Sequence, residues 1–290
     1  MKKVAIVGYA QHPILENAGA LNEVELIMPV VHQLFDELGI SQNNIDFTCS
    51  GSCDYLQGAA FAFVEGLSAI QTNPPIKESH VEMDAAWAMY ESMLKIQMGD
   101  ADTALIYGFG KSSPGRLDSI ISLQMDPYYI SPLWPDRVSL AAIQARVLLE
   151  KNIITPEQMI TAVIEARTNS KNNKNALVTE LVDKEAYLAS EKISSPLNEF
   201  DCPPISDGSS AMIIASEEKA YDFTDQPIFI EGIDHRIESS NIGSRDLSKP
   251  TGILASIEQL KLEKTKFDVA ELHTQFSHEV PYLQSVLNIS

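Results

Sequence analysis

Residues 82–109 read EMDAAWAMYESMLKIQMGDADTALIYGF, and they predict a helix followed by a buried strand. The helix, expected over Glu82–Met98, is rich in Ala and Met and ends at Gly99-Asp100. The strand, expected over Thr103–Phe109, is almost entirely apolar, as is typical of a strand covered on both faces. Strands and helices at this spacing indicate parallel βαβ units with helices packed on the faces of a sheet.

The same alternation continues on both sides of this stretch. Residues 23–38 carry apolar side chains at helical spacing, and Gly39 ends that helix. Further strands are expected at Lys3–Gly8, Asp46–Gly51, Ser209–Ala215, Ile228–Ile233 and Val269–His273, and further helices at about Tyr55–Ile70, Thr251–Leu260 and about His278–Leu287. Because the pattern occurs on both sides of residues 112–199, it permits a duplicated fold.

Residues 112–199 have a different character. The loop at 126–135, DPYYISPLWP, is unusually aromatic. A helix is expected over Val138–Lys151, and Thr155-Pro156 opens another with a cap residue and a proline at the first turn. Residues 169–175, NSKNNKN, form a locally basic segment. We interpret the whole stretch as an excursion that covers the sheet.

The composition limits the partners. The chain has 290 residues, 40 of them acidic and 21 basic, so its formal charge is −19. This excess argues against nucleic acid and against a polybasic membrane-surface helix, whereas one small anionic ligand needs only a local basic patch. No apolar run approaches the roughly 18 residues of a membrane span, and the N-terminus is interpreted as a strand rather than a signal peptide.

Three cysteines, Cys49, Cys53 and Cys202, are too few and too scattered for a disulfide framework. Cys49 and Cys53 have the spacing of a metal pair, but no second Cys/His pair at ligand spacing accompanies them. We therefore predict small thiols, no metal site and a reducing, cytoplasmic compartment.

Four segments resemble the thiolase superfamily, in particular its sterol-carrier, or non-specific lipid-transfer, thiolase-like group. Residues 202–211, CPPISDGSSA, resemble the C-P-x-S-D-G-A-A-A stretch of that group, and residues 271–276, ELHTQF, resemble its E-x-H-D-x-F motif. Residues 99–105 resemble the turn after the nucleophile helix, and residues 108–112 the glycine turn beyond it. The resemblance covers essentially the whole chain.

The resemblance implies an α/β thiolase fold, layered αβαβα, with duplicated βα halves. The N-terminal half is expected over residues 1–111 and 200–224, a cap over 112–199, and an incomplete C-terminal half over 225–290. Thiolases supply a further His in a G-H-P-x-G loop, and many have a second Cys near the C-terminus. Neither pattern follows Phe276.

The nucleophile of the thiolases is absent from this sequence. The resemblance places that cysteine on or next to Ala85, at the start of the helix predicted from Glu82. A thiolase carries the acyl group on a thiolate activated at a helix N-terminus, and alanine has no such group. Thiolysis and Claisen condensation are therefore not expected.

The candidate catalytic residues each have a structural alternative. His273 ends the last expected strand, and the resemblance implies that its N–H binds the thioester oxygen; the alternative is a hydrogen-bonded core histidine. Asp84 is either an acid/base group or the N-cap of the helix. Tyr128 either donates a proton or, with Tyr129, lines a hydrophobic wall. His278 is expected to be structural or solvent-facing.

The candidate coenzyme A ligands are Arg167, Lys171 and Lys174, which could meet its phosphates; the alternative is a solvated loop. Asp207-Gly208 is interpreted as a turn that positions neighbouring strands. No intrinsic cofactor is expected, and a coenzyme A thioester is the expected substrate.

The resemblance leaves more than one function open. The first is an acyl-CoA carbon–carbon lyase that cleaves a β-hydroxyacyl-CoA, with a steroid or lipid side chain, by retro-aldol chemistry. Related cysteine-less proteins imply a homodimer that acts with a small OB-fold/zinc-ribbon protein. The alternative is a non-catalytic scaffold that binds lipid or acyl-CoA. An acetyl-CoA acyltransferase would need Cys49, Cys53 or Cys202 as its nucleophile.

Overall fold

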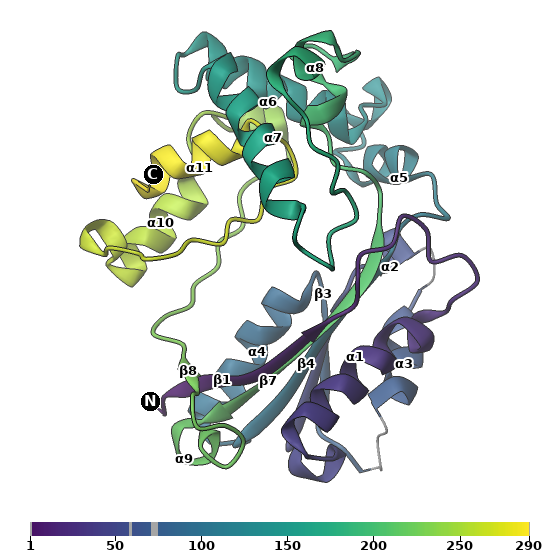
Figure 1. The fold of residues 1–290 in the computed structure, drawn as a ribbon, viewed down its shortest axis with the longest axis vertical. Helices are drawn as coiled ribbons and strands as arrows, with labels where there is room; N and C mark the ends of the chain where they lie inside the picture. Colours follow the sequence, from purple (N-terminus) through teal and green to yellow (C-terminus); the bar gives the residue numbers. More distant parts are fainter. Residues whose placement is uncertain (1, 58–59, 71–74, 290) are drawn as a thin grey trace. The chain divides into compact units, whose positions relative to one another are not determined.

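The computed structural model describes residues 2–57, 60–70 and 75–289. The chain folds as two compact units, each made of two segments (Figure 1). Unit 1 comprises Met1–Gly115 and Ile205–Ile233, and unit 2 comprises Arg116–Pro204 and Asp234–Ser290. No helix in the described residues is both long and apolar enough to cross a membrane.

Unit 1 is built on a mixed sheet. Its described strands are β1 (Val4–Gln11), β2 (Phe47–Ser52), β3 (Glu78–Glu82), β4 (Thr103–Lys111), β7 (Asp207–Ser216) and β8 (Ile228–Phe229). Their order is β3-β2-β4-β7-β1-β8. β3 and β4 pair with β2 in parallel, whereas β7, β1 and β8 form antiparallel pairs. The predicted parallel pairing therefore occurs among β3, β2 and β4, at one edge of the sheet.

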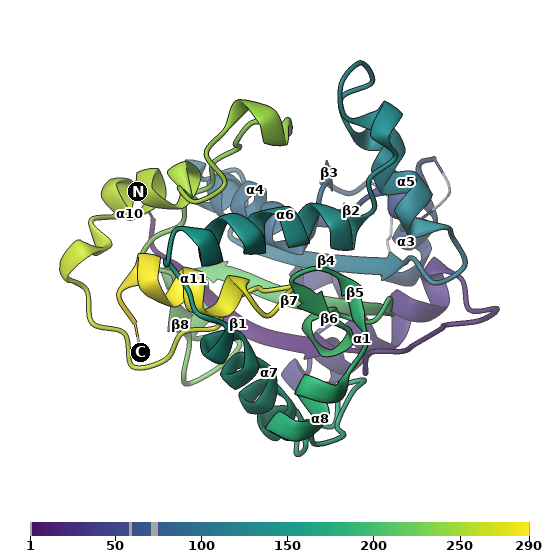
Figure 2. The same cartoon turned by 90° about the horizontal axis from the view of Figure 1, so that it is seen from above.

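Helices cover both faces of this sheet (Figures 1 and 2). α1 (Glu23–Leu38) packs with α3 (Ala62–Gly66) on one face, and α4 (Ala85–Met98) covers the other. Side chains of β4 alternate accordingly: Leu105 and Tyr107 join the core beneath α1, and Ala104 and Ile106 join the core beneath α4. Unit 1 thus has three layers, with α9 (Glu217–Ala220) after β7.

Local signals set the helix ends that the sequence predicted. Asn22 and Glu25 form a capping box at the start of α1, and Gly39 adopts a left-handed φ of 64° at its end. At the α7 start, Thr155 and Gln158 form the same box, with Pro156 as the first helical residue. Both helices therefore begin where their capping residues predicted.

Unit 2 is mainly helical. Its described helices are α5 (Leu117–Gln124), α6 (Arg137–Glu150), α7 (Pro156–Ser170), α8 (Lys184–Ala189), α10 (Thr251–Leu260) and α11 (Glu279–Leu287). β5 (Lys192–Ser194) and β6 (Leu197–Asn198) form a short antiparallel pair. The core joins α6, α7 and α11 through residues that include Leu148, Met159 and Tyr282.

Two predicted helices differ from those in the structure, and one strand was not predicted. The helix expected over Tyr55–Ile70 is broken into α2 (Asp54–Gln57), α3 and a 3₁₀ turn, and residues 58–59 of that prediction lie outside the described residues. The helix expected from Glu82 begins at Ala85, because Glu82 ends β3. β3 was not predicted: Val81, which packs against the α4 side, is its one large apolar side chain.

The strand expected over Val269–His273 is also absent. This segment is extended and exposed, with Val269 76% accessible, and it carries no strand pairing. A strand needs a neighbour that takes its backbone hydrogen bonds, and the described part of unit 2 offers only the short β5–β6 pair. The strand expected over Ile228–Ile233 shortens to β8, which pairs with β1 in unit 1. The second half of the predicted duplication therefore forms no second large sheet among the described residues.

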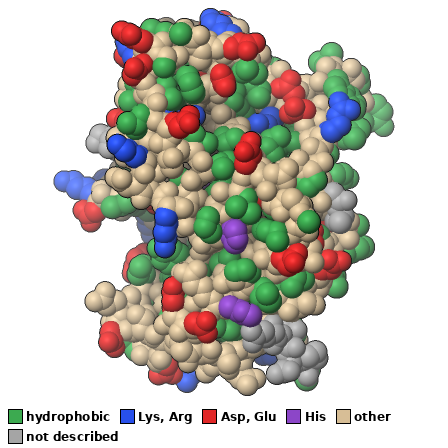
Figure 3. Space-filling model, turned by 45° about the vertical axis from the view of Figure 1, so that its right-hand side comes forward, with side chains coloured by type: hydrophobic (Ala, Val, Ile, Leu, Met, Phe, Trp, Pro, Cys, Tyr) green, Lys and Arg blue, Asp and Glu red, His purple; other side chains and the backbone are tan. Residues whose placement is uncertain are grey.

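The excess negative charge is distributed. Figure 3 shows Asp and Glu side chains spread over the visible face, with Lys and Arg side chains among them. Several of these charges form exposed ion pairs, such as Lys184 with Glu157 at 2.7 Å. Exposed pairs of this kind contribute little to stability, so the apolar core within each unit is the main source of its stability.

Candidate functional site

The start of α4 lies directly against the sheet of unit 1. Gly51 of β2 and Gly108 of β4 are paired in register beneath it. A Cβ atom at Gly51 would lie 2.2 Å from the carbonyl carbon of Asp84, and one at Gly108 would lie 2.8 Å from Cβ of Ala85. The two glycines therefore permit a contact that any other residue would obstruct. Ala85 begins the helix here.

Asp84 is the N-cap of α4. Its Oδ1 accepts hydrogen bonds from the backbone N–H groups of Ala86 at 2.9 Å and Trp87 at 3.3 Å. The positive end of the helix dipole favours the carboxylate at this place. The structure thus shows the capping alternative, and an additional acid/base role for Asp84 stays a prediction.

The three cysteines are free thiols. Burial, reinforced by the charge of Glu91, raises the pKa of Cys49 to about 12. Burial and the charge of Asp201 raise the pKa of Cys202 to about 11, and burial also raises the pKa of Cys53. Because a nucleophilic cysteine needs a lowered pKa, none of the three is prepared to carry an acyl group.

Unit 2 contains a cavity of about 240 Å³. Its lining includes Cys202-Pro203-Pro204 from one segment and Thr274-Gln275-Phe276-Ser277 from another, and Arg167 of α7 faces it as well. Both stretches belong to the two motifs that carry the thiolase resemblance. The fold of unit 2 therefore brings together segments that lie about seventy residues apart in the sequence.

A buried carboxylate holds these two segments together. Asp201 is 2% exposed, and its carboxylate accepts hydrogen bonds from the Tyr187 hydroxyl at 2.8 Å, the Asn198 N–H at 2.7 Å and the Ser277 hydroxyl. The Ser277 N–H also donates to the Asp201 carbonyl oxygen. Burial and the nearby Asp201 raise the pKa of Tyr187, so that its hydroxyl stays a donor. Neither Asp201 nor Ser277 was singled out from the sequence, because their partners are distant in the chain.

His273 lies in the exposed segment that precedes this cavity. The alternative of a core histidine at a strand end is therefore wrong, and its catalytic role stays a prediction. His278 is fully buried, with Nε2 3.3 Å from Gln144 Oε1. Burial lowers its pKa to about 4, so the ring is neutral near pH 7. His278 is structural, and the prediction that it faces solvent is wrong.

The other predicted residues of unit 2 lie on two elements. Arg167 places its guanidinium 5.7 Å from the ring centroid of Phe200, and Lys171 is the C-cap of the same helix. Lys174 follows in the exposed turn beyond. Tyr128 is 81% exposed in the loop after α5, where its N–H donates to Asp126. The structure thus brings Arg167 to the cavity and leaves the two lysines in an exposed turn, as in their solvated-loop alternative. Tyr128 is exposed and lines no hydrophobic wall among the described residues.

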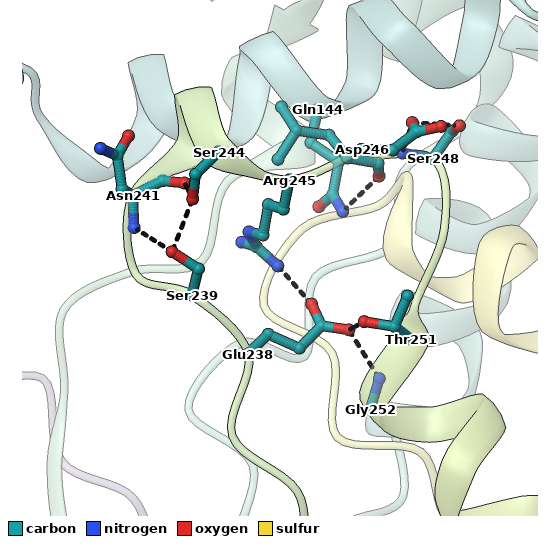
Figure 4. Close-up of polar contacts among 11 residues, drawn as sticks. Gln144, Glu238, Ser239, Asn241, Ser244, Arg245, Asp246, Ser248, Thr251 and Gly252 are labelled. Atoms are coloured by element: carbon teal, nitrogen blue, oxygen red, sulfur yellow. Dashed lines mark hydrogen bonds and ion pairs between the residues drawn. The ribbon is translucent and has the colours of Figure 1, made fainter.

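A further acidic residue, Glu238, organises the segment that leads into α10 (Figure 4). The Glu238 carboxylate accepts hydrogen bonds from Thr251 Oγ1 and the Gly252 N–H, both at 2.7 Å, and from Arg245 at 2.6 Å. Burial raises the pKa of Glu238, but these donors lower it more, and the net shift is downward. Glu238 therefore caps α10 from outside the helix and fixes the segment that leads into it.

Asp207 and Gly208 begin β7, so the turn predicted there is wrong, although Asp207 does hold neighbouring segments together. Its buried carboxylate accepts hydrogen bonds from the Ala18 N–H at 2.8 Å and from the Ser113 N–H and hydroxyl at 3.0 and 2.6 Å. Burial alone would raise its pKa, but the donors, with Ser113 foremost, make the net shift downward. In the described residues, no group of three or more His, Cys, Asp or Glu side chains is arranged to hold a metal ion.

No known family model matches the chain. Over 96% of its length it is 26% identical to an acetyl-CoA acetyltransferase of Methanocaldococcus jannaschii, of which it covers 74%. It is 30% identical to an acetyl-CoA acetyltransferase of Methanothermobacter thermautotrophicus over 48% of the chain and 38% of that protein.

Solved structures extend the comparison. The Ltp2-ChsH2(DUF35) aldolase matches 98% of this chain and 76% of its own, with a TM-score of 0.74 and 20% identity. The human mitochondrial 3-ketoacyl-CoA thiolase matches the whole chain with a TM-score of 0.74 and 16% identity, over 84% of its length. The same thiolase in complex with CoA gives a TM-score of 0.72 at 15% identity, over 83% of its length. The chain has a thiolase-like fold.

Within this thiolase-like fold, the residues that carry the resemblance fall into two groups. The stretch from Ala85 to Gly108 builds the start of α4 and the strand beneath it in unit 1. The CPP and HTQF segments meet at the cavity of unit 2. The two groups lie in different units, and Ala85 begins α4 in the first of them.

We predict that Gly108→Ala destabilises unit 1 by about 1–3 kcal/mol, because the added methyl overpacks the contact with Ala85. Gly110→Ala is the matched control, since it lies on the same strand and a Cβ there would meet nothing within 4 Å. Urea unfolding of both variants measures the difference. Equal stabilities would show that α4 can move away from the sheet at little cost.

The neutral, buried His278 makes stability depend on pH. Because its folded pKa of about 4 lies below its ordinary value of 6.5, the unfolded chain binds the proton more readily between these values. The contribution of His278 to the free energy of unfolding is therefore fully present above about pH 6.5. It decreases by up to about 3 kcal/mol as the pH drops toward 4. His278→Gln should flatten this part of the curve of unfolding free energy against pH, measured with urea. The same slope in both proteins would contradict the assignment, because the acidic residues are common to them.

Proposed function

We propose that the chain is an acyl-CoA carbon–carbon lyase that cleaves a β-hydroxyacyl-CoA by retro-aldol chemistry. The observation that supports the proposal is the start of α4, where Ala85 offers only a methyl group in a thiolase-like fold. The raised pKa values of the three thiols support it, because no cysteine is prepared to act as a nucleophile. A reaction without a covalent acyl-enzyme fits this site.

Retro-aldol cleavage needs no covalent acyl-enzyme. A base takes the proton of the β-hydroxyl group, the Cα–Cβ bond breaks, and its electron pair moves to the thioester as an enolate. Protonation of the enolate at Cα gives the shortened acyl-CoA, and the former β-carbon leaves as a ketone or an aldehyde. Hydrogen-bond donors at the thioester oxygen stabilise the enolate. We propose His273, in the motif segment that precedes the cavity, as one of these donors.

We propose that the coenzyme A part of the substrate binds near α7. Arg167 lines the cavity, and Lys171 and Lys174 follow on the last turn of that helix and beyond. In a chain with a formal charge of −19, three cations within eight residues supply a local patch for an anionic ligand. The solved complex of human 3-ketoacyl-CoA thiolase with CoA supports this class of ligand for the fold.

The exposed aromatic loop supports a large apolar acyl group. Tyr128, Tyr129 and Leu133 are at least 75% exposed, and Trp134 is 56% exposed. We propose that they contact a lipid or steroid side chain, with Tyr128 able to donate a hydrogen bond to a substrate oxygen.

We further propose a homodimer that works with an OB-fold/zinc-ribbon protein in the cytoplasm. The structural similarity to the Ltp2-ChsH2(DUF35) aldolase, whose name joins two proteins, supports a second protein. The three free thiols fit a reducing compartment.

A non-catalytic lipid or acyl-CoA scaffold is the second candidate. The use of the Asp84 carboxylate as a helix cap favours it, because this removes one predicted acid/base group from the start of α4. An acetyl-CoA acyltransferase, suggested by the names of the archaeal relatives, would need a thiol with a lowered pKa.

The decisive experiment incubates the purified chain with β-hydroxyacyl-CoA esters of short, long and steroid side chains. Mass spectrometry then detects the shortened acyl-CoA and the released carbonyl compound, with the chain alone and with the OB-fold/zinc-ribbon protein. Binding without cleavage in both conditions would favour the scaffold. Acetyl transfer that is lost on alkylation of the thiols would favour the acyltransferase.

The role of His273 gives a sharper prediction. His273→Ala should lower kcat by about 10²-fold or more, because one hydrogen bond to the enolate oxygen is lost. The folding of this variant should be unchanged, since the side chain is exposed. His12→Ala is the matched control, a histidine of unit 1 that contacts the neighbouring Pro13 carbonyl. Equal kcat values for the two variants would remove His273 from the mechanism.

A further inference from the structure

A row of polar side chains crosses three neighbouring strands of unit 1. Tyr107 of β4 is paired with Ser50 of β2, and Ser50 is paired with His80 of β3. Residues paired across strands point to the same face of a sheet. Ser50 Oγ lies 2.9 Å from Nδ1 of His80, and the ring of Phe63 on α3 stacks on the imidazole at 4.0 Å with an angle of 6°. The histidine ring is therefore fixed in position and orientation.

The second nitrogen of this ring faces a carboxylate. His80 Nε2 lies 3.6 Å from Oε2 of Glu82, two residues further along β3, and among the described residues it has no hydrogen-bond partner. The other oxygen of Glu82 accepts the Asp54 N–H at 2.8 Å. Half of the Glu82 side chain is exposed. One oxygen is thus held by the backbone, and the other lies between the imidazole and solvent.

Glu82 also lies where ligands of α/β sheets gather, at the carboxyl end of a strand. It is the last residue of β3 and is paired with Ser52, the last residue of β2. It precedes the cap Asp84 by two residues and Ala85 by three. Both oxygens of Asp207 accept hydrogen bonds from Ser113, whereas Oε2 of Glu82 faces only the imidazole of His80 among the contacts of the described residues.

We propose that Glu82 is the proton-transferring group of this site and that His80 positions it. The inference rests on the proposed lyase function. The Glu82 carboxylate takes the proton of the β-hydroxyl group while the C–O bond becomes C=O and the Cα–Cβ bond breaks. The protonated Glu82 then returns this proton to Cα of the enolate. No other reactant is needed, and the enzyme ends in its starting state.

The reverse direction gives a test that needs no knowledge of the carbonyl product. By microscopic reversibility, a group that protonates the enolate at Cα also removes that proton from an acyl-CoA. The full chain should therefore exchange the α-hydrogens of propionyl-CoA or acetyl-CoA for deuterium in D₂O, which mass spectrometry follows. This exchange tests proton transfer separately from bond cleavage.

Glu82→Gln should lower both the exchange rate and the kcat for cleavage by about 10²–10⁴-fold, as expected when a general base is lost. Its KM for the CoA ester should stay unchanged, and Glu82→Asp should restore part of the rate. His80→Phe, which can still stack on Phe63, should lower kcat without a change in KM. Glu78→Gln is the matched control, because Glu78 is an exposed carboxylate on the same strand and the same face.

The outcomes separate this inference from the proposed function. If the wild-type chain and Glu82→Gln cleave the substrate equally well, the role of Glu82 is overturned and the proposed lyase function is retained. A wild-type chain that neither cleaves nor exchanges would overturn both. Loss of rate in Glu82→Gln together with a lowered melting temperature, and no rescue by Glu82→Asp, would show that Glu82 only supports the α2 turn and would overturn the inference.

Discussion

In unit 1, the start of α4 lies directly against the paired glycines Gly51 and Gly108. This contact positions the residues at the carboxyl edge of the sheet. Helix and sheet meet there through backbone atoms and the methyl group of Ala85. Asp84 can cap the helix only because its first turn begins at this contact, and Glu82 ends its strand one short turn earlier. A backbone contact of this kind has little freedom to relax, because there is no side chain that can change its rotamer.

A second constraint comes from two buried carboxylates. Asp201 joins the turn at 198–202 to Ser277 in unit 2, and Asp207 joins β7 to the loops at Ala18 and Ser113 in unit 1. The motif segment CPPIS lies between these two aspartates in the sequence, and the chain passes from unit 2 to unit 1 within it. Each carboxylate accepts at least three hydrogen bonds, which makes the loss of either partner costly. The motif segment is therefore anchored at both ends by charge, although its own side chains are mostly apolar.

The sequence predicted those parts of the fold whose signals are local. α1 has the predicted bounds because a capping box, a periodic apolar face and the terminating Gly39 lie within or next to the helix. α10 also has the predicted bounds, although its cap comes from Glu238, outside the helix. β3 escaped prediction because one of its faces is polar and is covered by Phe63 from a helix far away in the sequence. Val269–His273 has the composition of a strand but no neighbour to pair with, and pairing is a property of the whole fold. In the candidate site, too, local signals could be predicted and distant partners could not. The motifs indicated the CPP and HTQF segments. The contacts of Asp201, His80 and Glu82 depend on residues in other strands or turns.

The replacement at Ala85 and the carboxylate at Asp84 are consistent with each other. In a thiolase the positive end of this helix stabilises the thiolate of the nucleophile. Here the same backbone N–H groups bind the Asp84 carboxylate. A cysteine beside that carboxylate would have its pKa raised by the like charge, and it would compete with Asp84 for the helix end. The pair Asp84-Ala85 therefore stabilises the start of the helix and does not suit a covalent acyl carrier. In the proposed reaction, proton transfer comes from groups outside the cap. Glu82, at the end of the strand that precedes the cap, meets that requirement without a covalent intermediate.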